Sequence, residues 1–290
     1  MLIRGLLILH YMVFCLRFLT IPWRYFQLNA RYFNNQKKIF SKQDLDAITP
    51  VEWRLKQYID RSDLRPERYP VFAKPEWGQN STGVSCIHNI AELGALRESC
   101  GYQAQNYLIQ EAAVGAIEFE VFVVKHPQKA GQFAVMSITQ VINHSADKFP
   151  VNGIYNSDTQ YQDITDALSP AEQQQLWQEL NRMGDFTIAR YSLKADSLGA
   201  LLQRQFKLVE VNLYVPMPLS LLSHNLTRLQ KYQLLYNTTH SLAQLAQQLN
   251  SKKVTQGIFF NKLIAARRSH GTRILTQDET NKATNLQMDQ

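Results

Sequence analysis

Three apolar runs follow one another between residues 107 and 142, and glycine or proline interrupts the chain between them. The runs are YLIQ at 107–110, EFEVFVV at 118–124 and FAVMSITQVI at 133–142. Their β-branched and aromatic residues predict strands. Further strands are predicted at 71–74, 186–194 and 206–212.

Helices are predicted at 90–100, at 170–183 after the N-cap Ser169, and at 219–249 with a break near Asn237. Strands that follow one another, with helices set apart from them, are typical of an α+β fold with mostly antiparallel sheets and helices on the faces.

Length and composition indicate a globular protein with anionic partners. A chain of 290 residues can form one large domain or two modest ones, and 45% hydrophobic with 19% charged residues is a globular composition. The net charge of +7 suits nucleotides, nucleic acid or an acidic membrane surface. No zinc-type spacing and no aromatic-and-basic RNA motif is present, so no nucleic acid is expected. The 3 cysteines are scattered, which favours a reducing compartment and a cytoplasmic protein.

The N-terminal 28 residues contain an apolar run from Gly5 to Leu16 between Arg4 and Arg17. The run is too short to span a bilayer, which takes about 20 residues. No small-residue cleavage site follows, so a secretory signal is not expected. Two interpretations remain open. Residues 1–28 form a helix in the interface of the inner membrane face, which would make the protein peripheral, or they form a docking helix of the core.

The stretch YPVFAKPEWGQNSTGV at 69–84 places Lys74 at the end of a short apolar strand. Pro75 ends this strand, and GQNSTG then provides a flexible loop with hydroxyl groups. A buried ammonium followed by such a loop can bind a polyphosphate, because backbone N–H groups of the loop point at the oxygens. The alternative is a strand lysine that reaches solvent and is followed by an ordinary turn.

Carboxylates gather around the next pair of strands. Gln110 and Glu111 end one strand, and Glu118 and Glu120 lie on the following one. A carboxylate at a strand edge can accept both hydroxyls of a ribose, and the backbone from Glu111 to Ala113 can read an adenine edge. The alternative is two solvated glutamates on the polar face of a strand, and for Glu120 this alternative is preferred.

A third cluster lies on the two last strands. Glu210 and Asn212 are two residues apart, so they share one face of their strand and offer oxygen ligands for Mg²⁺. The preceding strand, ARYSLKAD at 189–196, places Arg190, Ser192, Lys194 and Asp196 on one face as well. If these strands pair, Arg190 and Asp196 approach Glu210. The alternative is a salt-bridged antiparallel pair.

Taken in order, these motifs resemble the ATP-grasp superfamily. FAKPEWGQNSTGV, YLIQEAAVG, AIEFEVFVV and VEVN match its series within residues 40–222, and the chain is similar to D-alanine–D-alanine-ligase-like and related carboxylate–amine ligases. The resemblance implies two α+β subdomains with mostly antiparallel sheets, at 46–115 and 116–222. An apolar helix and basic linker at 1–45 would precede them, and a C-terminal helix and polar tail at 223–290 would follow.

The resemblance also implies roles for individual residues. Lys74 would be the second ATP lysine, which contacts the α- and β-phosphates, and Lys42, preferred over Lys56, would be the first ATP lysine. Arg190 would stabilise the transferred phosphate. The remaining implied residues are the triphosphate loop Gln79, Ser81, Thr82 and Gly83, the adenine hinge Gln110, Glu111, Ala112 and Ala113, the ribose carboxylate Glu118, and the magnesium ligands Glu210 and Asn212.

Two departures from the superfamily's pattern stand out. Ser192 occupies the place of a usual metal-binding aspartate, for which Asp196 is a candidate substitute, and residues 1–40 are too few for a substrate domain. The implied activity is an ATP- and Mg²⁺-dependent ligase that joins a small-molecule or peptide carboxylate to an amine through an acylphosphate. The alternatives are a nucleotide-binding protein without ligase activity, and an α+β binding module in which the motifs arise by chance. The substrates and the oligomeric state are not determined by the sequence.

Overall fold

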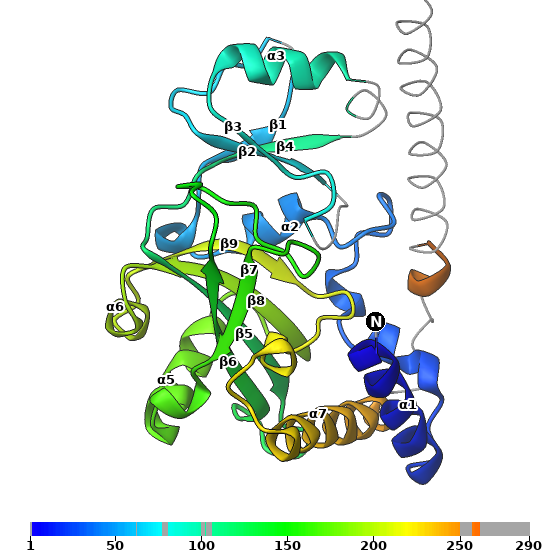
Figure 1. The fold of residues 1–290 in the computed structure, drawn as a ribbon. Coiled ribbons are helices and arrows are strands. Elements are labelled where there is room, and N and C mark those ends of the chain that lie inside the picture. The colour runs from blue at the N-terminus through cyan, green and yellow to red at the C-terminus, as the bar shows by residue number, and fades with distance from the viewer. Residues whose placement is uncertain are drawn as a thin grey trace, which may run out of the picture.

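Two antiparallel sheets form the body of the protein, one above the other in Figure 1. The computed structural model describes residues 2–61, 63–76, 81–99, 102, 106–249 and 257–261. Within these residues the smaller sheet has the strand order β1-β4-β2-β3, and the larger has the order β7-β6-β5-β8-β9. The predicted fold class, α+β with mostly antiparallel strands, is confirmed. The domain boundaries remain a prediction.

The small sheet is covered on one face by a single helix. Its strands are β1 (Gln57–Ile59), β2 (Val71–Pro75), β3 (Ser85–Ile87) and β4 (Tyr107–Glu111), and α3 (Ile90–Glu98) lies over them (Figure 1). Val71, Ala73 and Ile109 pack with Leu93 of α3 in one apolar cluster. Because side chains alternate along a strand, Lys74 and Gln110 lie on the opposite face, toward the large sheet. Strand β3 was not predicted.

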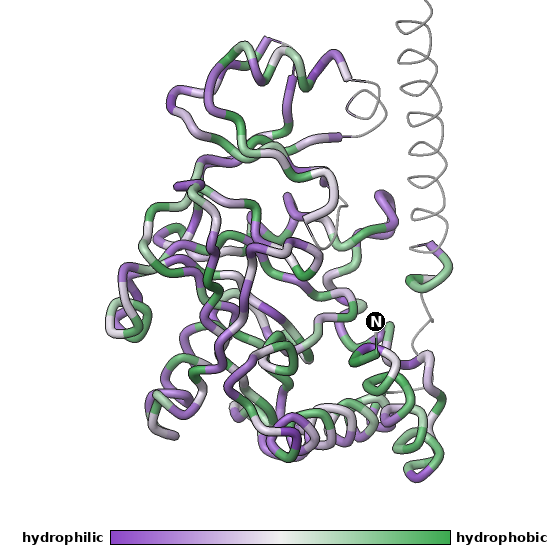
Figure 2. The backbone as a smooth tube through the Cα atoms, viewed as in Figure 1, coloured by the Kyte–Doolittle hydropathy of each residue, from purple (hydrophilic) through white to green (hydrophobic). Residues whose placement is uncertain are grey.

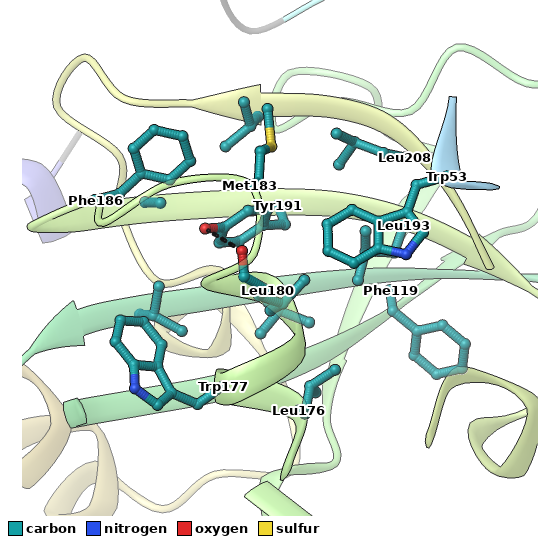
Figure 3. Packing of buried hydrophobic residues seen from close by; sticks show 14 of the residues in the cluster. Trp53, Phe119, Leu176, Trp177, Leu180, Met183, Phe186, Tyr191, Leu193 and Leu208 are labelled. Carbon is teal, nitrogen blue, oxygen red and sulfur yellow. Dashed lines mark hydrogen bonds between the residues drawn. The ribbon is translucent and has the colours of Figure 1, made fainter. Parts of the chain in front are cut away.

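The large sheet carries the main core on the face away from the small sheet. Its strands are β5 (Ile117–Lys125), β6 (Phe133–Asn143), β7 (Thr159–Asp163), β8 (Ile188–Ala195) and β9 (Phe206–Asn212). Helices α5 (Pro170–Leu180) and α6 (Leu198–Leu202) cover this face. Figure 3 shows Trp177 of α5 and Trp53 over Tyr191 and Leu193 of β8. Strand β7 was not predicted, and the other four strands agree with the sequence.

The opposite face of the large sheet is divided between apolar and polar contacts. Helices α1 (Leu2–Arg17) and α7 (Arg228–Gln248) pack against one part of it, where Phe14 and Leu242 meet Phe122 and Ile188. The other part lies beneath the small sheet and carries charged side chains. No helix within the described residues has the length and hydropathy needed to cross a membrane.

Two helix starts are set by capping residues. Ser169 caps α5 and forms a capping box with Glu172, as the predicted N-cap requires. For α7, the predicted start at residue 219 and the break near Asn237 are both wrong. Residues 219–222 form a separate 3₁₀ turn, and Thr227 with Gln230 forms the capping box that starts the helix. The helix then runs unbroken to Gln248.

Candidate functional site

A cleft lies between the two sheets, and most of its walls come from strands. The small sheet contributes Lys74 and Gln110, and the large sheet contributes Glu118, Glu120 and Arg190, among other side chains. These positions are far apart in sequence but share the two facing surfaces of the sheets. Strand alternation therefore brings the three predicted clusters together.

Strand register orders the side chains on the floor of the cleft. Glu118 of β5 is opposite Lys194 of β8. Glu120 of β5 is opposite Ser192 of β8, and Ser192 is opposite Glu210 of β9. In the next row, Arg190 of β8 is opposite Asn212 of β9. The predicted pairing of the two last strands is thus present, and it places Arg190 beside a predicted magnesium ligand.

Lys74 is buried at the junction of the two sheets, with 6% of its surface exposed. Its Nζ donates to Gln110 Oε1 at 2.6 Å and lies 3.5 Å from the Val209 carbonyl oxygen. Burial lowers the pKa of Lys74 to about 8; the negative charge of Glu210 opposes this shift, and the charge of Lys42 adds to it. The alternative of a lysine that reaches solvent is wrong.

A bulge in β9 provides the carbonyl that meets Lys74. In the β8–β9 register, Glu210 pairs with Ser192 and Leu208 pairs with the next residue, Leu193. Val209 therefore has no partner in β8. The Val209 carbonyl accepts from Lys74 Nζ at 3.5 Å and from Gln110 Nε2 at 3.3 Å. Bulges are common beside active sites because they turn backbone groups out of the ladder. This one links the two sheets across the cleft.

Lys42 and Lys56, the two candidates for the first ATP lysine, have different surroundings. Lys42 is the first residue of α2 (Lys42–Ala47), and its Nζ donates to the Pro75 carbonyl at 2.9 Å and lies 3.8 Å from Glu210 Oε1. It lines a smaller pocket that Lys74 also lines. Lys56 pairs instead with Glu67 at 2.6 Å, and both side chains are exposed. The geometry therefore favours Lys42.

The predicted adenine hinge lies mostly in the cleft wall. Gln110, Glu111 and Ala113 line the cleft, whereas Ala112 does not. The Ala112 N–H donates to the Pro70 carbonyl, and Glu111 Oε1 accepts from the Lys56 N–H at 2.8 Å. The backbone of this segment is therefore fixed by its neighbours before any ligand is present.

The predicted triphosphate loop is described only in part. Ser81 lines the cleft and its Oγ donates to the Asn152 carbonyl at 2.6 Å, whereas Thr82 is exposed outside it. Gly83 has φ +74°, and a Cβ there would lie 2.9 Å from Pro75 Cγ. Gln79 lies outside the described residues.

Glu120 corrects the sequence interpretation. It was expected to be solvated, but it lines the cleft with 8% of its surface exposed, and its Oε2 lies 3.0 Å from Arg190 Nε. Burial raises the pKa of Glu120 to about 7; Arg190 opposes the shift, and the charges of Glu118 and Glu210 add to it. Its two-residue spacing from Glu118 was the available signal, since both must leave the same face of β5.

The predicted oxygen ligands are only partly together. Glu210 and Asn212 line the cleft, and Asn212 Oδ1 accepts from the Tyr214 N–H at 3.1 Å. Asp196 is exposed just beyond the end of β8 and does not line the cleft, so it does not replace the missing aspartate. Among the described residues, no group of three His, Cys, Asp or Glu side chains is arranged to hold a metal.

A loop that the sequence interpretation left without a role closes one side of the cleft. Residues 149–154 line it, and Asn152 Nδ2 donates to Glu118 Oε2 at 2.9 Å. Asn152 also accepts from Ser81 through its carbonyl oxygen. This residue connects the predicted ribose carboxylate to the predicted triphosphate loop. Pro150 and Gly153 marked the segment as a loop, but nothing in the sequence placed it over this cleft.

Comparisons with known proteins give structural matches only. No protein family matches the sequence, and no curated protein matches it. Among solved structures, the D-alanine–D-alanine ligase from Bacillus anthracis complexed with ATP aligns at 16% identity and a TM-score of 0.47, covering 71% of this chain and 66% of that one. The L-amino acid ligase from Bacillus licheniformis aligns at 15% identity and a TM-score of 0.47, covering 74% of this chain and 49% of that one.

A third match is the ATP-grasp ligase PsnB complexed with minimal precursor. It aligns at 14% identity and a TM-score of 0.45, covering 75% of this chain and 63% of that one. The chain thus spans less than two thirds of the length of each of these ligases. Their names include the D-alanine–D-alanine ligases and the ATP-grasp superfamily that the motifs of the sequence resemble.

Proposed function

We propose that this protein is an ATP- and Mg²⁺-dependent ligase that joins a carboxylate to an amine through an acylphosphate. The observation that carries the proposal is the convergence of Lys74, Glu118, Arg190 and Glu210 on one cleft between two sheets. These residues belong to four different strands and were selected from three separate clusters of the sequence. A chance set of surface charges has no reason to share a cleft.

The cleft offers complementary groups for each part of a nucleotide. Lys74 lines the cleft, and Lys42 lines a smaller pocket that Lys74 also lines. A bound polyphosphate would supply a negative charge that offsets the cost of burying the Lys74 ammonium. The backbone at Gln110–Ala113 would lie along the base, and Glu118 would accept from the ribose hydroxyls. Ser81 would close the phosphate end of the site.

The donor set of Glu210 and Asn212 fits Mg²⁺, which prefers oxygen ligands and is bound in such sites through one or two carboxylates plus phosphate oxygens. When bound, the cation would neutralise charge on the phosphates. Arg190 would bind the transferred phosphoryl group, and Lys74 would orient it toward the substrate carboxylate. No covalent protein nucleophile is required, because an amine displaces phosphate from the acylphosphate.

Acceptor-dependent phosphate release tests this proposal. Purified protein with Mg-ATP and pooled amino acids or short peptides should release phosphate only when an acceptor is present. Arg190→Ala should abolish release, because the transferred group then loses its cation, while Arg31→Ala at the exposed pair with Asp185 should leave release unchanged. Absence of ATP binding by the wild-type protein would refute the proposal.

One observation favours a second candidate, a nucleotide-binding protein without ligase activity. The centre of the carboxylate row holds Ser192, a neutral group, where the superfamily usually has a metal ligand. Tight ATP binding without phosphate release, with any acceptor, would support this candidate over the ligase.

The outer surface of α1 carries a separate proposal, which concerns where the protein works. Tyr11, Phe14 and Cys15 of α1 are buried among residues that include α7, as the docking interpretation expects. Much of α1 has the colour of hydrophobic residues in Figure 2, and many of these residues are exposed. Its exposed apolar residues, with those of the following turn, are Leu2, Leu6, Ile8, Leu9, Met12, Val13, Leu16, Leu19, Ile21 and Trp23.

This surface suits an anionic bilayer. Arg17 ends the helix and Arg24 follows it, so cations flank an apolar strip that also carries a tryptophan, a residue favoured at the membrane interface. The net charge of +7 acts in the same direction. We therefore propose that α1 lies on the inner face of the membrane.

Vesicle flotation tests the membrane contact. The wild-type protein should float with vesicles that contain phosphatidylglycerol, and Leu9→Glu should abolish flotation because the glutamate would enter the acyl region. Ile90→Glu, a matched charge at a partly exposed position of α3, should float as the wild type does. Equal flotation of the wild type and Leu9→Glu would refute the membrane contact. The contact would also be refuted if the protein formed a dimer through α1 and this dimer did not float with the vesicles.

A further inference from the structure

One row of side chains across three neighbouring strands is unusual in its order. Glu120 on β5, Ser192 on β8 and Glu210 on β9 are aligned in register, and all three face the cleft. Neighbouring strands lie about 4.8 Å apart, so the two glutamates are separated by about 10 Å at the backbone. The serine between them is short, which leaves the space above it open to both longer side chains.

The Glu120 carboxylate is only partly satisfied. Its Oε2 is fully buried and accepts no hydrogen bond from any described residue, although Arg190 Nε lies 3.0 Å away. The contact between Arg190 and Glu120 is therefore an ion pair in which the direction of the N–H group does not suit a hydrogen bond. A buried carboxylate oxygen without a hydrogen bond is costly, which makes this oxygen a candidate ligand atom. Glu120 is more than nine-tenths buried and lines the cleft.

Other described acidic side chains near this row are engaged or distant. Glu118 accepts from Asn152 at 2.9 Å and from Ser192 Oγ at 3.5 Å. Asp196 is exposed beyond the strand end and does not line the cleft. Asn212 Oδ1 accepts one hydrogen bond, from the Tyr214 N–H, and a carbonyl oxygen has a second lone pair. Glu118 is thus held by Asn152, whereas Glu120 Oε2 accepts no hydrogen bond from a described residue and Glu210 Oε1 lies 3.8 Å from Lys42 Nζ. With Asn212, these two carboxylates are the candidate oxygen donors beside Ser192.

We propose that Glu120 is a ligand of the divalent cation, which it binds together with Glu210 and Asn212 above Ser192. This inference rests on the proposed nucleotide site and adds a residue to it. Two carboxylates, one amide oxygen and the phosphates of the nucleotide form an oxygen set that Mg²⁺ accepts.

The proposal also gives Arg190 two states. Without a cation, its guanidinium is the charge partner of Glu120. A bound cation would take over that role, and the guanidinium would then compensate the charge of the phosphoryl group instead. Cation binding and phosphate binding at Arg190 would thus support each other.

Binding of Mn²⁺, followed by electron paramagnetic resonance, tests the proposal without any turnover. The protein is titrated with Mn²⁺ in the presence of a non-hydrolysable ATP analogue. Glu120→Gln keeps the shape of the side chain and removes its charge, and it should weaken Mn²⁺ binding about tenfold or more. The matched control Glu98→Gln removes an exposed carboxylate of α3 and should bind Mn²⁺ as the wild type does.

Relocation of the carboxylate provides the decisive variant. Glu120→Gln combined with Ser192→Asp moves the charge by one strand and should restore Mn²⁺ affinity toward the wild-type value, but it should bind Mn²⁺ more weakly than Ser192→Asp alone, because only the single variant keeps Glu120 as a ligand. Ser192→Asp alone retains Glu120 and should tighten binding, which keeps the proposal testable if Glu120→Gln does not fold.

Two results overturn the inference. One is wild-type Mn²⁺ affinity in folded Glu120→Gln, and the other is the same Mn²⁺ affinity in Ser192→Asp with and without Glu120→Gln. Binding of the ATP analogue in EDTA, measured by calorimetry on the same proteins, separates this failure from that of the nucleotide site. A wild-type protein that binds the analogue, with Mn²⁺ affinity unaffected by Glu120→Gln, refutes only the role of Glu120. A wild-type protein that binds neither refutes the nucleotide site as well.

Discussion

Replacing Lys74 by methionine is expected to weaken ATP binding roughly a hundredfold, because a charge-assisted contact to phosphate is lost. The same change should stabilise the protein. Burial lowers the pKa of Lys74 from 10.5 to about 8, so the folded protein holds its ammonium at a cost. Each pKa unit corresponds to about 1.4 kcal/mol, and loss of the hydrogen bond to Gln110 offsets about 1 kcal/mol. A net gain of about 2–3 kcal/mol should raise the melting temperature by several degrees.

Calorimetry of ATP binding and thermal unfolding measure the two effects. The pKa of Lys74 is lower in the folded than in the unfolded state, so the unfolded chain binds more protons between pH 8 and 10.5. The advantage of the methionine variant should therefore be largest below pH 8 and shrink as the pH rises toward 10.5. Lys56→Met, at an exposed ion pair, is the control and should change neither quantity. Wild-type ATP affinity in Lys74→Met would remove this lysine from the phosphate site.

Replacing Gly115 by valine is expected to destabilise the protein by about 3 kcal/mol and to abolish ATP binding. Gly115 lies between β4 and β5, where the chain passes from the small sheet to the large one. Its φ is +144°, and a Cβ would lie 2.9 Å from the Ala195 backbone nitrogen and 3.1 Å from the Lys194 carbonyl carbon. These atoms belong to β8, which pairs with β5 on one side and β9 on the other and so cannot move aside. The connection between β4 and β5 must therefore shift instead.

Urea denaturation and ATP binding check this prediction. Gly131→Val is the matched control: its φ is +74°, but no atom lies within 4 Å of the added Cβ. It should cost only the backbone strain of about 1–2 kcal/mol and leave ATP binding intact. Equal losses of stability in the two variants would mean that contact with β8 is not what requires a glycine at 115.

Strand alternation explains why much of the cleft could be predicted. Residues two apart on a strand share a face, so Arg190 with Ser192, and Glu210 with Asn212, were placed together from spacing alone. Runs of apolar, β-branched and aromatic residues predicted β5, β6, β8 and β9 of the large sheet, but not β7. Lys74 followed from the stop at Pro75 and the loop after it.

The remaining features depend on register and on tertiary contacts. The bulge at Val209 adds a residue to β9 and shifts its register with β8. No local sequence pattern indicated this bulge. The sequence also left Asn152 without a partner, because its contact with Glu118 joins a loop to a distant strand. Glu120 was misinterpreted because an isolated glutamate in a strand is usually solvated, whereas here the small sheet covers it.

The hydrogen bonds at Val209 have a consequence for how a ligand is received. The amide of Gln110 and the backbone carbonyl of Val209 surround the Lys74 ammonium with neutral oxygens while no anion is present. If a phosphate binds at Lys74, it would replace these weak dipoles by a full opposite charge and would weaken the contact of Lys74 with Val209, which joins the upper and lower sheets. Under the proposed function, ligand binding would then be coupled through this one side chain to the freedom of the two halves to move.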